Sequence, residues 1–295
     1  MAGLDLAALT GPVSADDPCG PDLDLEGDPD YFNFLARAEG LLPASFFSGP
    51  DGGPFDRSAI NFDNEFAAMA PLFERTRDLR LAALLARLHI LNRNIAGFSM
   101  AVSAIAQLVD EQWEGVHPRG EDGDFLLRMT AIETLDDMPT VVLPMQFLPL
   151  ALHRRAGQIN YRGYLIATGE VRAREGEEAL DTGSIDRALM EVDLPPLIET
   201  MRQFDAVNKT LLRIRQIWID RAGFDQAVAI EKSAQLAGRI VTLLNGVVAR
   251  RDPAAALGEA AGAPASDADG QDGAAAAGAP PAAAAPAAGA PISLG

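Results

Sequence analysis

The side chains best suited to nucleophilic or metal chemistry in this chain are three histidines and one cysteine. His89, His117 and His153 lie far apart, and none has the H-E-x-x-H or Cys/His spacing that places two metal ligands on one face. Cys19 lies in a Pro/Gly-rich turn beside Asp17, and nearby carboxylates raise the pKa of a thiol. We therefore expect no metal site and no cysteine nucleophile, and we interpret Cys19 as a small buried residue that locks its turn.

Acidic residues cluster in the loop Glu121-Asp122-Gly123-Asp124, which raises the question of a cation site. An EF-hand loop needs a glycine at its sixth position, but counted from Asp122 that position holds Leu127. We interpret the loop as a turn that ends with Asp124 capping a helix. The adjacent carboxylates Asp136-Asp137 read as surface, and the chain has no Walker A, G-x-G-x-x-G or G-x-S-x-G sequence. The prediction is a protein without catalytic residues or cofactor; a hydrolase that uses the acidic 120–124 loop remains an alternative.

Composition narrows the classes of partner. The 295 residues include 24 basic and 42 acidic side chains, for a formal net charge of -18, which argues against a nucleic-acid surface. The N-terminus lacks the basic and apolar regions of a signal peptide, and no apolar run approaches the roughly 20 residues that span a bilayer. With one cysteine, no intramolecular disulfide can form. We expect a cytoplasmic protein without membrane insertion.

Helices must position these residues, because apolar residues recur at steps of three and four through most of the chain. Asp28-Pro29 predicts a helix start, with Phe32, Leu35 and Ala36 on the buried face. Asp78 is expected to cap a central, largely buried helix. Further helices are predicted over 62–75, about 98–113 and about 124–138, and short extended pieces at Val141-Val142-Leu143 and Phe147-Leu148. Asn160 is expected to start one short helix.

The last structured part is predicted to be a long antiparallel helical hairpin. Its two apolar seams have heptad-like spacing: Leu197, Met201, Phe204, Val207, Leu211, Ile214 and Trp218, then Ala227, Ile230, Ala234, Ala237, Val241, Leu244 and Val248. Ala222-Gly223-Phe224-Asp225 supplies a glycine stop and an aspartate cap. A second column (Leu236, Ile240, Leu243 and Val247) would offer a strip for self-association if it remained exposed. From 253 onward, Ala, Gly and Pro predominate, which predicts a disordered tail or linker.

Three ordered motifs stand out along the chain. The first is Pro18-Cys19-Gly20 with Asp22-Leu23, and the second is Asp78-Leu79-Arg80 at a helix start. The third combines Trp113, His117-Pro118, the Gly-Asp loop and Arg128. In this order and spacing, the motifs resemble the N-terminal domain of the TssA (ImpA) proteins of the bacterial type VI secretion system. The resemblance is firm over about 16–135 and looser to about 250.

The motif residues are candidates for a structural role or for contact with a partner. We expect His117 to cap the preceding helix through its ring or to pack against Trp113. We expect Arg128 to pair with Asp110, Glu111 or Asp124 and so to hold two helices in register, with partner contact as the second interpretation.

The resemblance implies a non-enzymatic assembly factor that helps recruit the baseplate and guides growth of the tail tube and sheath. Implied partners are baseplate, tube, sheath and membrane-complex proteins, and a sheath-end capping protein with the same N-terminal domain is an alternative. Such proteins carry a ring-forming domain after the linker, and none is recognisable in this sequence, which is either a fragment or a short natural form. We therefore expect a monomer or small oligomer, with self-association through the 195–250 hairpin open.

These predictions together give an all-α fold with a few short extended segments. They divide the chain into an extended lead-in (1–27), an ImpA-like helical domain (28–178), a hairpin extension (179–252) and a disordered tail (253–295).

Overall fold

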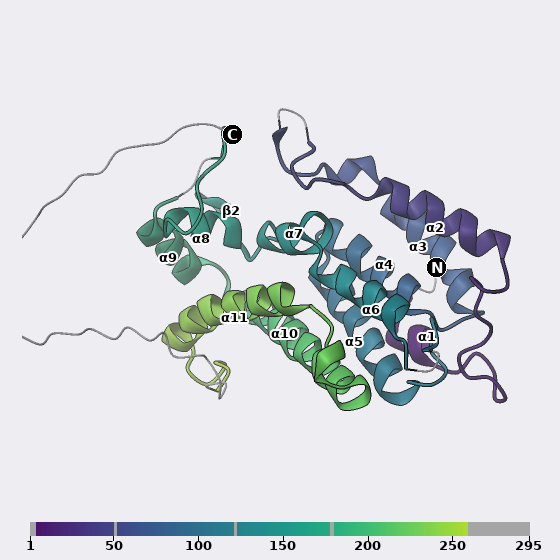
Figure 1. Ribbon diagram of the computed structural model, residues 1–295. Helices are drawn as coiled ribbons and strands as arrows, with labels where there is room; N and C mark the ends of the chain where they lie inside the picture. Colours follow the sequence, from purple (N-terminus) through teal and green to yellow (C-terminus); the bar gives the residue numbers. More distant parts are fainter. Residues whose placement is uncertain (1–3, 50–51, 121–122, 178–179, 259–295) are drawn as a thin grey trace, which may run out of the picture. The chain divides into compact units, whose positions relative to one another are not determined.

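Helices predominate in the computed structural model, which describes residues 4–49, 52–120, 123–177 and 180–258 (Figure 1). The helices are α1 (Leu6–Thr10), α2 (Pro29–Leu41), α3 (Phe62–Phe73), α4 (Leu79–Leu91), α5 (Ile95–Glu111), α6 (Leu126–Glu133), α7 (Leu143–Gln146), α8 (Tyr161–Ala167), α9 (Thr182–Glu191), α10 (Leu194–Ala222) and α11 (Glu231–Arg251). Strands β1 (Ala151–His153) and β2 (Gly157–Ile159) form one antiparallel pair. The prediction of a mostly helical chain is confirmed. Within the described residues, no helix has the length and apolarity that crossing a membrane requires.

Helix α4 is nearly surrounded by other elements because apolar side chains cover almost its whole circumference. All of its residues except Arg80 and Arg87 are buried, and it packs against α5 and α6. Asp78 caps it as predicted, since its carboxylate accepts the Arg80 N–H at 2.8 Å. The two arginines therefore mark the only sides on which α4 approaches solvent.

One histidine, His89, is buried in the last turn of α4. Its ring stacks on Phe66 of α3 with centroids 4.4 Å apart. A side chain at Gly97 of α5 would come within 2.3 Å of the ring nitrogen Nδ1, so the glycine makes room for the imidazole. Burial lowers the pKa of His89 to about 4, which keeps the ring neutral at physiological pH.

This buried histidine predicts a loss of stability in mild acid. Above pH 6.5 the ring is neutral in both folded and unfolded chains, so it adds no pH dependence. Between pH 6.5 and about 4 only the unfolded chain takes up the proton, so unfolding becomes more favourable, by about 3 kcal/mol in total. The measurement is the free energy of unfolding of the wild type and of His89→Gln at pH 7, 5.5 and 4. The wild type should lose more stability than the variant across this range; parallel pH profiles would contradict the assignment.

Helices α10 and α11 lie side by side and run antiparallel (Figure 1). The amide of Asn208 donates to the Ala234 carbonyl at 2.7 Å, and Arg215 lies 2.9 Å from Glu231. Gly223, with φ of 92°, ends α10. The α10 seam from Leu197 to Trp218 is buried throughout, and α10 also packs against α5. The long helix therefore joins the hairpin to the rest of the fold.

The second apolar column of α11 does not remain exposed. Leu236, Ile240 and Val247 are buried and Leu243 is half-buried. Helix α11 has neighbours other than α10, since it also contacts α9 and the turns over 134–142. The strip considered for self-association is thus occupied within the chain.

The segment after α6 is more helical than its prolines suggested. Val141-Val142-Leu143, expected as an extended piece, is helical instead. Val141 and Val142 lie in a π-helical turn over Met138–Val142 that Asp137 caps, and Leu143 is the first residue of α7. The prolines stand in the first turn of these short helices, where no intrahelical N–H is needed. The strand pair comes later, at β1 and β2, and Asn160 starts α8 as predicted.

The N-terminal lead-in, expected as extended over 1–27, contains helix α1. Asp5 caps it by accepting the Ala8 N–H at 2.8 Å, and Leu9 is buried where α1 packs on α5. Residues up to Leu257 form one compact unit. The division into a helical domain and a hairpin extension at residue 178 remains a prediction. Leu257 exchanges two hydrogen bonds with Asn245. Of the tail expected over 253–295, residues 253–258 are described, and the rest, from 259 onward, lies outside the described residues.

Candidate functional site

The three sequence motifs meet at one place, which we call the motif junction: residues 17–24, 76–80 and 113–118 together with Arg128. Backbone hydrogen bonds connect them. The Arg77 N–H donates to the Cys19 carbonyl at 2.7 Å, the His117 N–H donates to the Arg77 carbonyl at 3.0 Å, and the Leu79 N–H donates to the His117 carbonyl at 2.8 Å. Segments nearly 100 residues apart in sequence are thereby held together at the start of α4.

The Pro-Cys-Gly turn fits this junction through its backbone. Gly20 has φ of 66°, and a Cβ there would lie 2.2 Å from the Arg75 carbonyl oxygen. The Pro18 carbonyl accepts the Val13 N–H at 2.9 Å. The Cys19 side chain is buried, and burial, followed by the charge of Asp17, raises the pKa of its thiol. The sequence-based interpretation of Cys19 as a buried packing residue agrees with this geometry.

His117 is buried, and its ring bonds to the Pro-Cys-Gly turn rather than to the preceding helix. Its ring nitrogen Nε2 lies 2.8 Å from the Gly20 carbonyl, which can only accept, so Nε2 carries the proton. Its other nitrogen, Nδ1, lies 3.5 Å from a carboxylate oxygen of Asp22, and the following His117-Pro118 peptide bond is cis. The expectation that the ring caps the preceding helix was wrong, because its hydrogen-bond partner lies 97 residues away. Packing of the ring against Trp113 stays a prediction.

A charged network closes the junction around the α4 N-terminus. Asp78 is completely buried and accepts the Tyr31 hydroxyl at 2.9 Å as well as the Arg80 backbone N–H. Arg80 Nη2 lies 3.0 Å from Asp22 and 2.7 Å from Asp78, and Nη1 contacts Asp24. Burial opposes the charged form, but the hydrogen bond and charge of Asp78 dominate and the pKa of Arg80 is raised. The network fixes the lead-in to α2 and α4.

Arg128 holds the 113–118 loop by donating to three backbone carbonyls. Its Nε donates to Pro118 at 2.8 Å, Nη1 to Trp113 at 2.8 Å and Nη2 to Val116 at 2.9 Å. The guanidinium also lies over the Trp113 ring, 4.9 Å from its centroid, and is 1% exposed. Burial lowers the pKa of Arg128 to about 10.

The acidic partners expected for Arg128 are engaged elsewhere. Asp110 pairs with Arg213 of α10, Glu111 accepts from Gln107, and Asp124 accepts the Leu126 N–H. Among the described residues, Arg128 forms no ion pair. The structural role expected for Arg128 agrees with the geometry, but its partners are carbonyl oxygens that sequence spacing does not reveal.

Aromatic side chains connect the junction to the hairpin. The Trp113 ring lies edge-on to Trp218 of α10 with centroids 5.1 Å apart, and Phe125 packs against both. From the sequence, Trp218 was expected only in the hairpin seam. Phe125 was not among the candidates, although its position beside Asp124 in the third motif is a sequence signal that could have identified it.

Most of the family-motif candidates are buried. Cys19, Gly20, Asp78, Leu79, Trp113, His117, Pro118 and Arg128 are buried, and Pro18 and Arg80 are partly buried. Glu121 and Asp122 of the acidic loop lie outside the described residues. Across the described ranges, no three or more His, Cys, Asp or Glu side chains are grouped so that they could hold a metal ion.

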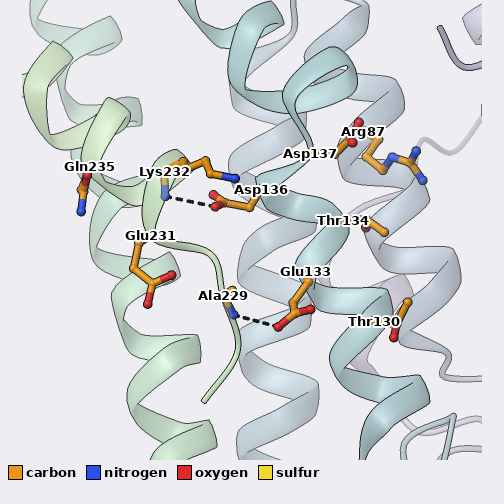
Figure 2. A pocket seen from close by; sticks show the side chains of 10 residues that line it. All are labelled: Arg87, Thr130, Glu133, Thr134, Asp136, Asp137, Ala229, Glu231, Lys232 and Gln235. Atoms are coloured by element: carbon orange, nitrogen blue, oxygen red, sulfur yellow. Dashed lines mark hydrogen bonds between the residues drawn. The ribbon is translucent and has the colours of Figure 1, made fainter. Parts of the chain in front are cut away.

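A second feature is a pocket of about 540 Å³ between α6 and the start of α11 (Figure 2). Asp136, interpreted from sequence as a surface residue, is buried there and accepts the N–H groups of Lys232 at 3.1 Å and Ser233 at 2.6 Å. Glu133 accepts the Ala229 N–H at 3.0 Å. The cap of α11 therefore comes from Asp136, and the expectation that Asp225 caps it was wrong, since Asp225 lies in a separate 3-10 turn.

The Asp136 cap predicts an asymmetric effect of two aspartate substitutions. Asp136→Ala should lower the free energy of unfolding by about 2 kcal/mol, because two N–H groups at the α11 start lose their acceptor. Asp225→Ala should change it by less than about 0.5 kcal/mol. Urea unfolding of both variants measures the difference; similar losses would argue against the cap from Asp136.

Fold and site define a helical domain whose charged motif residues hold its own segments together. Residues 10–137 match the family model described as the ImpA N-terminal domain of the type VI secretion system, and the junction lies within that range. This match agrees with the resemblance inferred from the motifs, which is confirmed over this part of the chain.

Two known proteins are similar over longer stretches. The type VI secretion system component TssA1 of Pseudomonas aeruginosa is 29% identical over 245 residues, which cover 79% of this chain and 66% of the relative. The chain therefore spans slightly less than two thirds of that relative's length. The solved N-terminal domain of the TssA component of Burkholderia cenocepacia, including its conserved ImpA_N region, aligns with a TM-score of 0.61. The alignment covers 84% of this chain and 95% of that domain at 17% sequence identity, which supports a shared fold.

Proposed function

We propose that this chain is a non-enzymatic assembly component of a bacterial type VI secretion system. The observation that carries the proposal is the agreement between the ImpA N-terminal match at 10–137 and the similarity to TssA1 over 79% of the chain. The motif residues have structural partners that account for their types. This supports a binding and positioning role over catalysis.

The partners and the location follow from the same resemblance and are part of the proposal. We infer contacts with baseplate, tube, sheath or membrane-complex proteins, and a cytoplasmic location. With a net charge of -18, the chain is suited to protein partners that present basic surfaces and not to nucleic acid.

Deletion of the gene in its own bacterium tests the proposal. With a fluorescently labelled sheath subunit, the deletion strain is expected to form few or no extended sheaths, and the wild-type gene on a plasmid should restore them. Normal sheath numbers in the deletion strain would reject the assembly role.

The same imaging separates the alternatives. Early foci of the labelled chain that precede sheath growth fit an initiating component, whereas signal only at the distal end of extended sheaths would favour a sheath-end cap. To test the hydrolase, Glu121, Asp122 and Asp124 are replaced together by amides. Unchanged secretion in that strain would exclude an acidic-loop enzyme.

A further inference from the structure

Helix α6 presents two leucines to solvent beside the buried Arg128. Leu126 is 64% and Leu127 is 68% exposed. Arg128 anchors the helix through its three carbonyl contacts, so the position of the leucines is fixed by the fold. Single exposed apolar residues are ordinary on protein surfaces, and their surroundings decide whether they matter.

Leu127 forms one edge of an apolar groove of about 270 Å³ between α2, α4 and α6. Leu35 of α2 lines it, with Ala83 of α4 and Ala131 of α6. Both alanines are nearly inaccessible, at 2% and 6% exposure, so short side chains form the floor. Such a depression between helices suits a large apolar side chain from another helix.

The arginines beside this apolar groove already have acidic partners. Arg80 pairs with Asp22, Asp24 and Asp78. Arg87 lies 3.0 Å from Glu39 and donates to Thr140 at 3.1 Å. These cations therefore do not give the groove a net positive character.

Carboxylates without a cationic partner lie next to the groove. The pocket of Figure 2 shares Arg87, Thr130 and Thr134 with the groove, so the two adjoin. Glu133, Asp136 and Asp137 line this pocket together with Lys232. Within the described part of the chain, none of the three carboxylates lies within ion-pair distance of a cation. The total charge of -18 strengthens the negative potential there.

We propose that the apolar groove and these carboxylates together bind a basic amphipathic helix of a partner protein. One large apolar side chain of the partner occupies the space between Leu35 and Leu127, and its lysines or arginines face Glu133 and Asp137. This assigns a contact surface to the proposed assembly role and extends it. The binding test below uses the purified chain, so it can fail while the deletion phenotype stands.

Two synthetic peptides serve as probes of the full-length chain. They share one helical leucine stripe and differ only in carrying lysine or glutamate on the polar face, and fluorescence anisotropy reports binding. The lysine peptide should bind with an affinity that falls as salt rises, and the glutamate peptide should not bind measurably.

Two variants locate the site. Leu127→Ser should lower the affinity for the lysine peptide at least tenfold. Because the substitution changes no charge, this loss would show that the groove itself contributes to binding, beyond diffuse electrostatic attraction. Leu152→Ser, at a residue 79% exposed on β1, is the matched control and should leave affinity unchanged. The double variant Glu133→Gln, Asp137→Asn should lower the affinity for the lysine peptide and reduce the salt dependence of binding. The fold should be kept, because the amide oxygens still accept the Ala229 and Thr140 N–H groups.

Three results would overturn the proposal. They are no binding of the lysine peptide, equal binding of both peptides, or an affinity that Leu127→Ser leaves unchanged. Sedimentation provides a further check: a dimer of the free chain that Leu127→Ser dissociates would assign the groove to a second copy instead of a basic partner.

Discussion

Replacing Arg128 by methionine is expected to lower the free energy of unfolding by about 4 kcal/mol. The substitution leaves the carbonyls of Trp113, Val116 and Pro118 without their donor in a buried site. A buried unsatisfied polar group costs about 1–3 kcal/mol. Removing the desolvated cation offsets part of this loss of stability, because burial disfavours the charged guanidinium. The unpaired carbonyls outweigh that return because only one side of the network is replaced.

Arg119→Met provides the matched control in the same loop. Its side chain is 51% exposed, and its contacts within the described residues are a hydrogen bond to Gly115 at 3.3 Å and an exposed ion pair with Asp17 at 4.0 Å. The expected loss is therefore below about 0.5 kcal/mol. Both tryptophans of the chain lie in the aromatic cluster beside Arg128, so their fluorescence during urea unfolding reports on this region. Equal stability of the two variants would contradict the role given to the three hydrogen bonds.

Features that depend on a few neighbouring residues could be predicted from the sequence. Asp28, Asp78 and Asn160 each accept an N–H group two or three residues ahead, and all three were expected to begin helices. Apolar spacing likewise indicated the buried side of α4 and the α10 seam. Both signals are local, because a cap and a helical face are set within one or two turns.

The buried face of α2 was predicted one residue out of phase. Phe32 and Ala36 were expected inside, but Phe32 is 45% exposed, and Tyr31, Phe34 and Ala38 are buried. Tyrosine looks less suited to a core than phenylalanine until its hydroxyl has an acceptor. Asp78, 47 residues later, accepts from Tyr31 at 2.9 Å, which removes the cost of burying the hydroxyl.

For the site residues, the partners of the side chains were even harder to predict from the sequence. Their types and order pointed to a shared role, but His117 bonds to Gly20 and Asp136 caps α11 across 96 residues or more. Such partners depend on the path of the whole chain, so periodicity and spacing carry no information about them. The acids expected to pair with Arg128 lie in the helix and loop before it, and in the fold they bond to Arg213, to the Gln107 side chain and to a nearby backbone N–H instead.

Gly20→Ala is expected to be the most destabilising glycine-to-alanine substitution in this domain. Its φ of 66° costs an alanine about 1–2 kcal/mol, and the new Cβ would lie 2.2 Å from the Arg75 carbonyl oxygen. That oxygen belongs to backbone next to the motif junction, so relief of the clash requires the Pro-Cys-Gly turn to move. Movement there weakens the Arg77–Cys19 and His117–Gly20 hydrogen bonds together. We expect a total loss of more than about 3 kcal/mol.

Gly27→Ala separates the two contributions, because Gly27 has a similar φ of 70° and no neighbouring atom lies within 4 Å of the position that a Cβ would take. Its expected loss is about 1 kcal/mol, from backbone conformation alone. Urea unfolding gives both values, and hydrogen exchange at the Arg77 amide shows whether the damage is at the junction, since that N–H donates to the Cys19 carbonyl. Protection at Arg77 should fall in Gly20→Ala and persist in Gly27→Ala. If the two variants lose the same stability, the turn tolerates displacement, and the tight approach of residues 20 and 75 is not what holds the first motif against the second.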